Sequence, residues 1–507
     1  MSSSSSLIAA VLGACLLAPP LADAQSTDHF TAAVLDEPEA LDMTSVKYRP
    51  PSSAVLRNVE EMLWGFRPDG SVMPTVADWT VGPGAKTITF EIHPGIKFHS
   101  GDELTAADVV FSIARVTAHA PSLKRHTRYI DKVEALDRYT VRFDFNAPDV
   151  NFFDGAEWFL ASKAYYDRVG ETAFVEHPSG IGPYRVVDYE RGQYLDLAAF
   201  DGYYGKAPQI RAARIYFVKD DETRVDRLKA GEVDMVMDAA YTDVAALRQA
   251  GFATVRLPAN PTVSLVFDLL NPKAPWADKR VRRAIALGID GDAIVKNLFH
   301  GVPDRYPRLA PGEAGYDPTL KPYPYDPAEA KRLLAEAGYP DGFAMPLYYP
   351  TASFYGYRET AEAVALYLQA IGVRCQVQGE ETVRLQARTA RIKSDPHALF
   401  VGLSNEPMAN SGLPPLEMLT ISFLSTTGMV LNKSPALDAQ INSGLGELDS
   451  RRRAARVAAA IRLIHDDIQT IPIWDTAVVF AMKPRVHYRP IEHRMPHLAL
   501  RDVTIGP

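Results

Sequence analysis

The chain has 507 residues, 47% of them hydrophobic and 23% charged, which is the composition of a globular protein with two or three domains. The formal net charge of −8 argues against nucleic acid as a partner. Only two cysteines occur, so neither a disulfide framework nor a cysteine-cluster metal site is predicted. One of them, Cys375, alternates with Val373 and Val377, which predicts a buried strand position rather than a reactive thiol.

The first 24 residues predict an export signal. Residues 7–18 are apolar, prolines end the run, and residues 22–24 (Ala-Asp-Ala) have the small side chains of a signal-peptidase site. The apolar run is too short to cross a bilayer. We therefore expect cleavage between Ala24 and Gln25 and a periplasmic mature protein. Lipidation at Cys15 is the alternative, because the residues before it resemble a lipoprotein box.

The stretch after residue 86 joins a strand to a helix. Alternating apolar residues over 87–92 predict a half-buried strand. Turns at 93–95 and 100–102 follow, with a second short strand between them. A helix then opens at Thr105, and Asp108 three residues later is its capping partner. The apolar face of this helix is predicted to hold Val109, Ile113 and Val116.

Strand and helix patterns alternate along the rest of the chain, which favours an α/β architecture with a partly parallel sheet. Asp326 can cap a helix that has Pro327 at its first position, and Gly338 can end it. Strands are predicted at 30–35, 141–145, 184–189 and 263–270, and helices at 221–231, 276–289, 327–338, 361–372 and 451–468.

Several stretches of this chain resemble the family 5 extracellular solute-binding proteins of ABC importers, the dipeptide-, oligopeptide- and nickel-binding type. Residues 180–184 are similar to the family's G-T-G-P-Y, and residues 221–236, 276–289 and 500–503 follow other family segments. The stretch after residue 86 matches the family at Thr87, Thr89, Phe90, Gly95, Lys97, Phe98, His99, Gly101, Leu104, Thr105, Ala106, Asp108, Val109, Val110, Phe111 and Ser112.

The resemblance implies a periplasmic-binding-protein clam-shell, in which two α/β lobes are joined by two crossings and an extra lobe is inserted in the first. We expect the crossings near residues 258–266 and 471–474. The expected division is a signal peptide, 1–24; lobe I, 25–52, 181–260 and 476–507; an inserted lobe, 53–180; and lobe II, 261–475.

The same resemblance implies a monomeric binding protein that captures a small molecule or short peptide between its lobes and delivers it to ABC-transporter permease subunits. No cofactor, catalytic residue or metal ligand is expected. A secreted enzyme is the rival class, but the motifs H-E-x-x-H, G-x-S-x-G and C-x-x-C are absent. A sensor subunit is a third reading. The ligand stays open among peptides, opine-like conjugates, oligosaccharides and metal chelates.

The expected solute-binding residues follow from the resemblance and from side-chain chemistry. Residues 402–410 stand where peptide-binding relatives carry G-W-x-x-D-x-x-D-P, which points to Ser404, Asn405 and Glu406. Upstream arginines could hold a carboxylate through two parallel hydrogen bonds, although a solvent-facing basic helix is the alternative. Segments that line the cleft in relatives add two aromatic residues, each of which could equally belong to the core. The arginines are Arg384 and Arg388, and the aromatic residues are Tyr48 and Trp158.

Overall fold

The computed structural model describes most of the chain after the expected signal peptide. Among the predicted site residues, Ala24, Gln25 and Tyr48 lie outside the described part, as does Cys15, and the side chains of residues 404–406 are likewise not described. The described residues are 29–44, 55–67, 72–119, 127–155, 158–306, 308–309, 311–351, 356–392, 400–406, 414–426, 431, 433–490 and 497–506.

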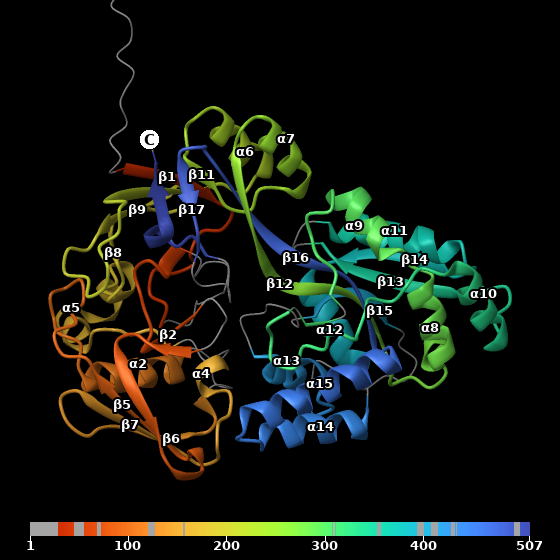
Figure 1. Ribbon diagram of the computed structural model, residues 1–507, viewed down its shortest axis with the longest axis horizontal. Helices are drawn as coiled ribbons and strands as arrows, with labels where there is room; N and C mark the ends of the chain where they lie inside the picture. The colour runs from red at the N-terminus through yellow and green to blue at the C-terminus, as the bar shows by residue number, and fades with distance from the viewer. Residues whose placement is uncertain are drawn as a thin grey trace, which may run out of the picture.

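One ten-stranded sheet runs through both halves of the molecule (Figure 1) in the order β14-β13-β15-β12-β16-β11-β1-β10-β9-β8. Strand β1 is parallel to β10 and β11, and β13 is parallel to β14 and β15, as the predicted α/β pattern requires. The strands are β1 (His29–Val34), β8 (Tyr184–Glu190), β9 (Tyr194–Ala199), β10 (Ala212–Phe217), β11 (Met235–Val236), β12 (Ala253–Phe267), β13 (Ala344–Pro350), β14 (Arg374–Glu380), β15 (Val401–Glu406) and β16 (Thr470–Met482).

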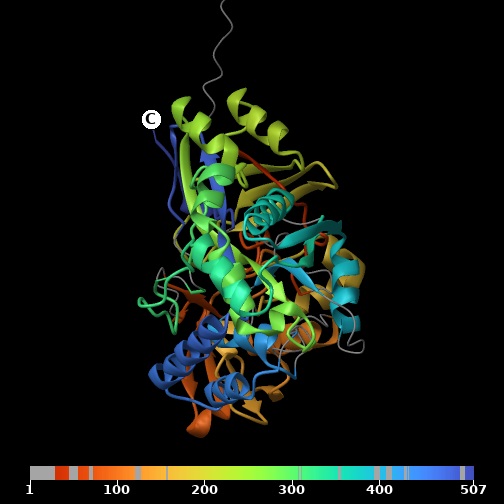
Figure 2. The same ribbon diagram turned by 90° about the vertical axis from the view of Figure 1, so that its right-hand side faces the viewer.

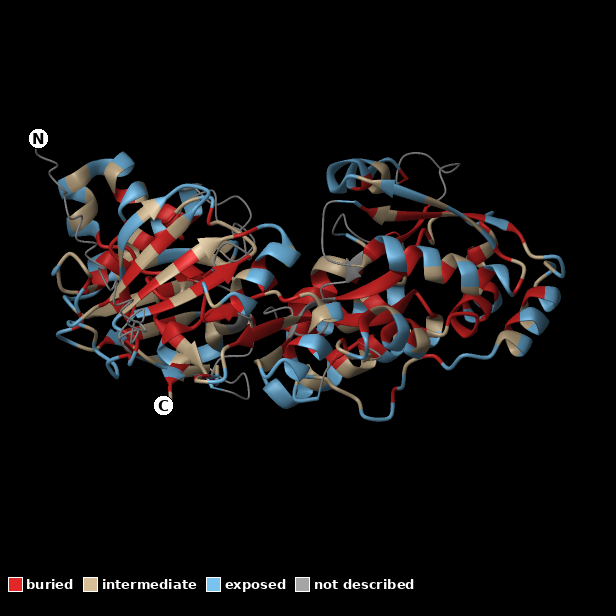
Figure 3. Cartoon of the chain, turned by 90° about the horizontal axis from the view of Figure 1, so that it is seen from above, coloured by how far each residue is buried: buried red, intermediate tan, exposed pale blue. Residues whose placement is uncertain are grey.

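The two longest strands, β12 and β16, carry the chain between the halves. They pair antiparallel from Ala253 opposite Met482 to Val266 opposite Thr470, and the register shifts between Pro258 and Thr262. Seen from above, the molecule is narrow where these strands pass between its two halves, and buried residues continue along them there (Figure 3). Strands β12 and β16 include the residues at which the two crossings are expected.

The segment between β1 and β8 folds around a sheet of its own, in the order β4-β5-β7-β6. Alternation buries Ile88, Phe90 and Ile92 on one face of that sheet, against helix α2. Trp64 packs there against Phe90, with ring centroids 5.8 Å apart. The elements are β2 (Trp64–Phe66), β3 (Val72–Pro74), β4 (Ala77–Val81), β5 (Thr87–Ile92), α2 (Ala106–His119), β6 (Ile130–Ala135), β7 (Thr140–Phe145), α4 (Phe152–Gly155) and α5 (Lys163–Glu176).

Separate clusters of buried apolar side chains form around lobe I, the inserted lobe and lobe II. A further cluster lies among α13, α14 and α15. Lobe I carries α6 (Asp221–Lys229), α7 (Val244–Gln249), β17 (Val486–Tyr488) and β18 (Val503–Ile505). Lobe II carries α8 (Lys279–Leu287), α9 (Gly291–Phe299), α10 (Pro327–Glu336), α11 (Tyr357–Gln369), α12 (Thr382–Ile392), α13 (Pro415–Phe423), α14 (Pro435–Leu445) and α15 (Ser450–Asp467). None of the described helices has the length and hydrophobicity of a membrane span.

Local capping signals were predicted well. The Asp326 side chain accepts a hydrogen bond from the Glu329 amide, and Gly338 adopts a φ of +92° just after α10. Asp108 accepts hydrogen bonds from both the amide and the hydroxyl of Thr105. The predicted second strand between residues 95 and 101 is wrong, because two turns so close together leave room only for an isolated bridge from Lys97 to Glu103.

Candidate functional site

The predicted residues Ser404 to Glu406 end strand β15 beside the crossing. Asn405 lies opposite Val263 and Glu406 lies opposite Thr262, on the lobe II side of the register shift in β12. Hydrogen bonding to β12 thus fixes the backbone of this segment at the point where the two halves join.

A buried carboxyl group braces the same point from the other strand. The Thr262 hydroxyl donates to Oδ1 of Asp475 (2.5 Å), and the Tyr306 amide donates to Oδ2 (2.6 Å). Burial raises the pKa of Asp475 to about 7, and the nearby charge of Asp304 acts in the same direction. Asp304 is itself held by Arg256 and by the Tyr306 hydroxyl. The crossing therefore contains an acidic network that sequence reasoning missed.

Helix α12 carries the predicted arginines, and the structure separates them. The Arg388 guanidinium pairs with Glu380 through Nε (3.1 Å) and a second nitrogen, and it lies over the Tyr348 ring at 4.2 Å. Arg384 is exposed and makes no ion pair with any described residue. Figure 1 shows α12 near the middle of the molecule, on the side of lobe II that faces the other half. Of the two predicted arginines, Arg384 is thus the one whose guanidinium pairs with none of the described residues.

Trp158 lies in the core of the inserted lobe. Its side chain is buried and packs against Phe152, with ring centroids 6.2 Å apart. Trp158 therefore has the surroundings of a core residue, which was the alternative to a role in solute binding. Its indole N–H has no hydrogen-bond partner among the described residues.

A buried arginine joins lobe I to the inserted lobe just before the segment that contains Tyr48. Arg115 of α2 donates to Asp42 Oδ2 (2.7 Å), to Thr44 Oγ1 (2.9 Å) and to Glu171 of α5 (2.5 Å). Glu60 is buried beside this group, and burial followed by the Asp42 charge raises its pKa well above the usual range. This network holds the segment of Asp42 and Thr44 against the inserted lobe.

The inserted lobe also touches lobe II directly. Asn151 Nδ2 donates to Glu417 Oε2 of α13 across 3.2 Å, although 266 residues separate the two in sequence. Both side chains are buried, and Val150 packs against the apolar cluster of α13 to α15. The two halves thus meet at a second place, away from the crossing strands.

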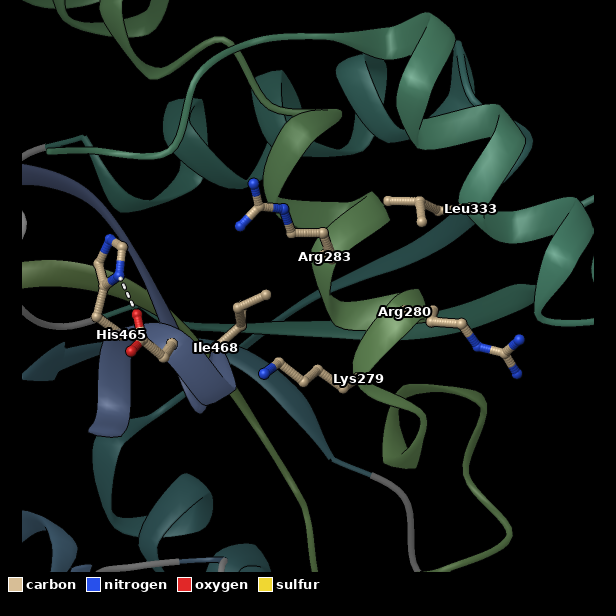
Figure 4. A pocket seen from close by; sticks show the side chains of 7 residues that line it. Lys279, Arg280, Arg283, Leu333, His465 and Ile468 are labelled. Carbon is tan, nitrogen blue, oxygen red and sulfur yellow. Dashed lines mark ion pairs between the residues drawn. The ribbon is translucent and has the colours of Figure 1, made fainter. Parts of the chain in front are cut away.

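A surface depression of about 500 Å³ lies on lobe II, between α8, α10 and the end of α15 (Figure 4). His465 Nδ1 lies 3.5 Å from Asp466 Oδ1 at its edge, and burial lowers the pKa of His465, which favours the neutral imidazole. None of the predicted solute-binding residues lines it. The described residues hold no group of His, Cys, Asp and Glu that could bind a metal ion. The lining residues are Lys279, Arg280, Arg283, Leu333, His465, Asp466 and Ile468.

This arrangement of two α/β lobes, two crossing strands and an inserted third lobe defines a two-lobed solute-binding protein. Residues 72–414 match the model of the bacterial extracellular solute-binding proteins, family 5. The chain belongs to that family.

Named relatives have the same architecture and diverse ligands in their names. The chain is 29% identical over 387 residues to the glutathione-binding protein GsiB of Pectobacterium atrosepticum, covering 73% of this chain and 72% of that protein. It is 26% identical over 482 residues to heme-binding protein A of Haemophilus influenzae, covering 88% and 86%. Among solved structures, NikA of Brucella suis in complex with Fe(III)-EDTA has a TM-score of 0.83 at 20% identity, covering 94% of this chain and 100% of that one. These relatives are binding proteins rather than enzymes.

Proposed function

We propose that the protein captures a peptide or peptide-like solute between its lobes in the periplasm and delivers it to the permease of an ABC importer. The observation that carries this proposal is the family match over residues 72–414. The position of Ser404 to Glu406 at the crossing strands supports it, because a solute there could bias lobe closure directly. The lobe boundaries given by the sequence are part of the proposal.

Glutathione-like anionic peptides are the ligand class that the chain supports best. The relative named for glutathione aligns over almost three quarters of the chain. Arg384 offers a guanidinium that no described residue occupies, and a planar guanidinium suits a carboxylate. Glu406, at the end of β15, is the acidic group that could receive a peptide amine.

A non-peptide ligand is the second candidate. Heme-binding protein A aligns over a larger share of this chain than GsiB does, and AgaA of Agrobacterium tumefaciens, solved with agropinic acid, has a TM-score of 0.72 at 23% identity. An opine, a heme-like compound or a metal chelate would use the same place between the lobes.

The test is a thermal-shift series on the purified mature protein with glutathione, a neutral dipeptide, hemin and nickel–histidine as probes. A ligand that binds only the native state adds RT ln(1 + [L]/Kd) to stability, so a probe at 100 times its Kd adds about 2.7 kcal/mol. We expect glutathione to raise the melting temperature and Arg384→Ala to remove most of that increase. No increase with any peptide probe would refute the peptide proposal.

A further inference from the structure

The contact between the inserted lobe and lobe II joins two parts of the fold that have separate apolar cores. In Figure 1, α4 faces α13, and in Figure 2 the inserted lobe (orange) and the C-terminal helices (blue) lie at the same end of the molecule. The two parts are joined by the hydrogen bond from Asn151 Nδ2 to Glu417 Oε2. Asn151 is 6% exposed and Glu417 is 5% exposed, so both partners are shielded from water here.

Each side of this contact is anchored firmly in its own lobe. The Asp149 side chain accepts a hydrogen bond from the Asn151 amide (3.0 Å), which fixes the turn before α4. The Trp64 indole donates to the Phe153 carbonyl (3.0 Å), so this turn moves with the core of the inserted lobe. Glu417 lies in the first turn of α13, a helix whose apolar residues belong to the cluster shared with α14 and α15.

We propose that Asp149, Asn151 and Glu417 form a latch that holds the inserted lobe against lobe II in the closed protein, and that a proton on the Asp149–Glu417 pair tightens this latch. The proposal rests on the proposed function only in taking the two lobes to separate and close. Opening would break the bond between Asn151 and Glu417 and expose Asp149 to water. Closing brings the half-buried carboxyl group of Asp149 toward the buried one of Glu417, which costs least when one of them is neutral.

The electrostatics of Asp149 agree with that geometry. The pKa of Asp149 is raised to about 6, chiefly by burial and also by the charge of Glu417, while the hydrogen bond from the Asn151 amide and the charge of Arg128 act in the opposite direction. Glu417 on α13 and Arg128 before β6 are the charged groups that act on Asp149 among the described residues.

The sign of the pH effect follows from that shift. A group whose pKa is higher in the closed form stabilises that form fully when the pH lies below the ordinary pKa of the group. This contribution is lost as the pH rises through the closed-form pKa of about 6. With an open-form pKa near 4, the closing equilibrium should weaken roughly tenfold between pH 5 and pH 7.5.

The experiment measures the distance between lobes without any solute, so its result is independent of what the protein binds. Donor and acceptor dyes are placed on Asp131→Cys in β6 and Lys331→Cys in α10, both exposed positions, in a Cys375→Ser background. Single-molecule energy transfer then gives the closed fraction at pH 5 and pH 7.5. We expect more closed molecules at pH 5 in the parent and fewer at both pH values in Asn151→Ala.

Asp149→Asn separates the latch from other titrating groups. An asparagine oxygen can still accept the Asn151 amide, so the turn should stay intact while the titration disappears. The matched control is Asp137→Asn, because Asp137 also accepts amide hydrogen bonds in a turn of the same lobe but is exposed. We expect a flat pH response in Asp149→Asn and the parent response in Asp137→Asn. An unchanged pH response in Asp149→Asn, or a distance that stays long at both pH values in the parent, would overturn the proposal.

Discussion

Arg115→Ala should destabilise the protein strongly, because Arg115 is the cation of the buried network between lobe I and the inserted lobe. The Arg115 side chain is 3% exposed and its partner Asp42 is 1% exposed. Removing one member of such a buried pair leaves the other charge without compensation, which costs about 3–5 kcal/mol of unfolding free energy. The second partner, Glu171, is half-exposed, so losing that ion pair adds at most about 1 kcal/mol.

The surroundings of Asp42 make this cost hard to avoid. Asp42 keeps its hydrogen bonds from the amide (2.8 Å) and hydroxyl (2.6 Å) of Thr44, but at 1% exposure it has little access to water that could solvate its charge. Glu60 is buried nearby, and Arg115 is the group that offsets its repulsion from Asp42. Asp42→Asn should therefore recover part of the stability lost in Arg115→Ala, since it removes the unpaired charge.

The assay is urea unfolding followed by tryptophan fluorescence, because Trp64, Trp79 and Trp158 all lie in or against the core of the inserted lobe. Arg142→Ala is the matched control, since Arg142 pairs with Asp144 (3.1 Å) and Glu134 (3.4 Å) at the surface of that lobe. An exposed pair contributes about 0–1 kcal/mol. Equal losses in the two variants would refute the argument that the buried network holds the lobes together.

Three further predictions concern the crossing, α12 and the lone thiol. The pKa of Asp475 is raised to about 7, so the stability that its neutral form contributes is lost as the pH rises through that value. The melting temperature of Asp475→Asn should therefore fall less between pH 5 and pH 8 than that of the parent. Parallel melting curves for the two proteins would contradict this prediction. In calorimetry, Arg384→Ala should cost about 2–5 kcal/mol of binding free energy. Arg388→Ala should leave the affinity unchanged, because the Arg388 guanidinium is already paired with Glu380. A larger loss of affinity in Arg388→Ala than in Arg384→Ala would contradict this assignment. Burial raises the pKa of Cys375 to about 12. At pH 8 the thiol of the folded protein should therefore react with a disulfide reagent roughly a thousandfold more slowly than the thiol of the unfolded chain. Equal rates would show that the folded protein exposes a reactive thiolate.

Local patterns in the sequence were enough to predict several of the strands and helices. Each rests on an interaction within a few residues, such as the Asp326 cap of α10 or the alternation that buries Phe90 in β5. Cys375 does lie in a strand, β14, where it is half-buried. The arrangement of the lobes and the two crossings came from the family resemblance, because the spacing of apolar residues within one element does not show how the elements are divided among lobes.

Side-chain partners could not be predicted in the same way. Periodicity shows which face of an element is buried but not which distant group it meets, so the bond from Asn151 to Glu417 has no signal in the sequence. The arginines of α12 looked alike, yet only Arg388 lies where Glu380 and Tyr348 can receive it. Asp475 follows an apolar run that reads as an ordinary strand, and its hydrogen bond to the Tyr306 amide depends on a loop folded beside the crossing.

The central claim is that this protein binds a solute between its lobes and releases it chemically unchanged. The most direct measurement is native mass spectrometry of the mature protein after incubation with glutathione, followed by denaturation and analysis of the released compound. We expect one glutathione per chain, recovered at its original mass after prolonged incubation. A chain that retains no solute, or one that releases a cleaved or otherwise altered product, would contradict the account.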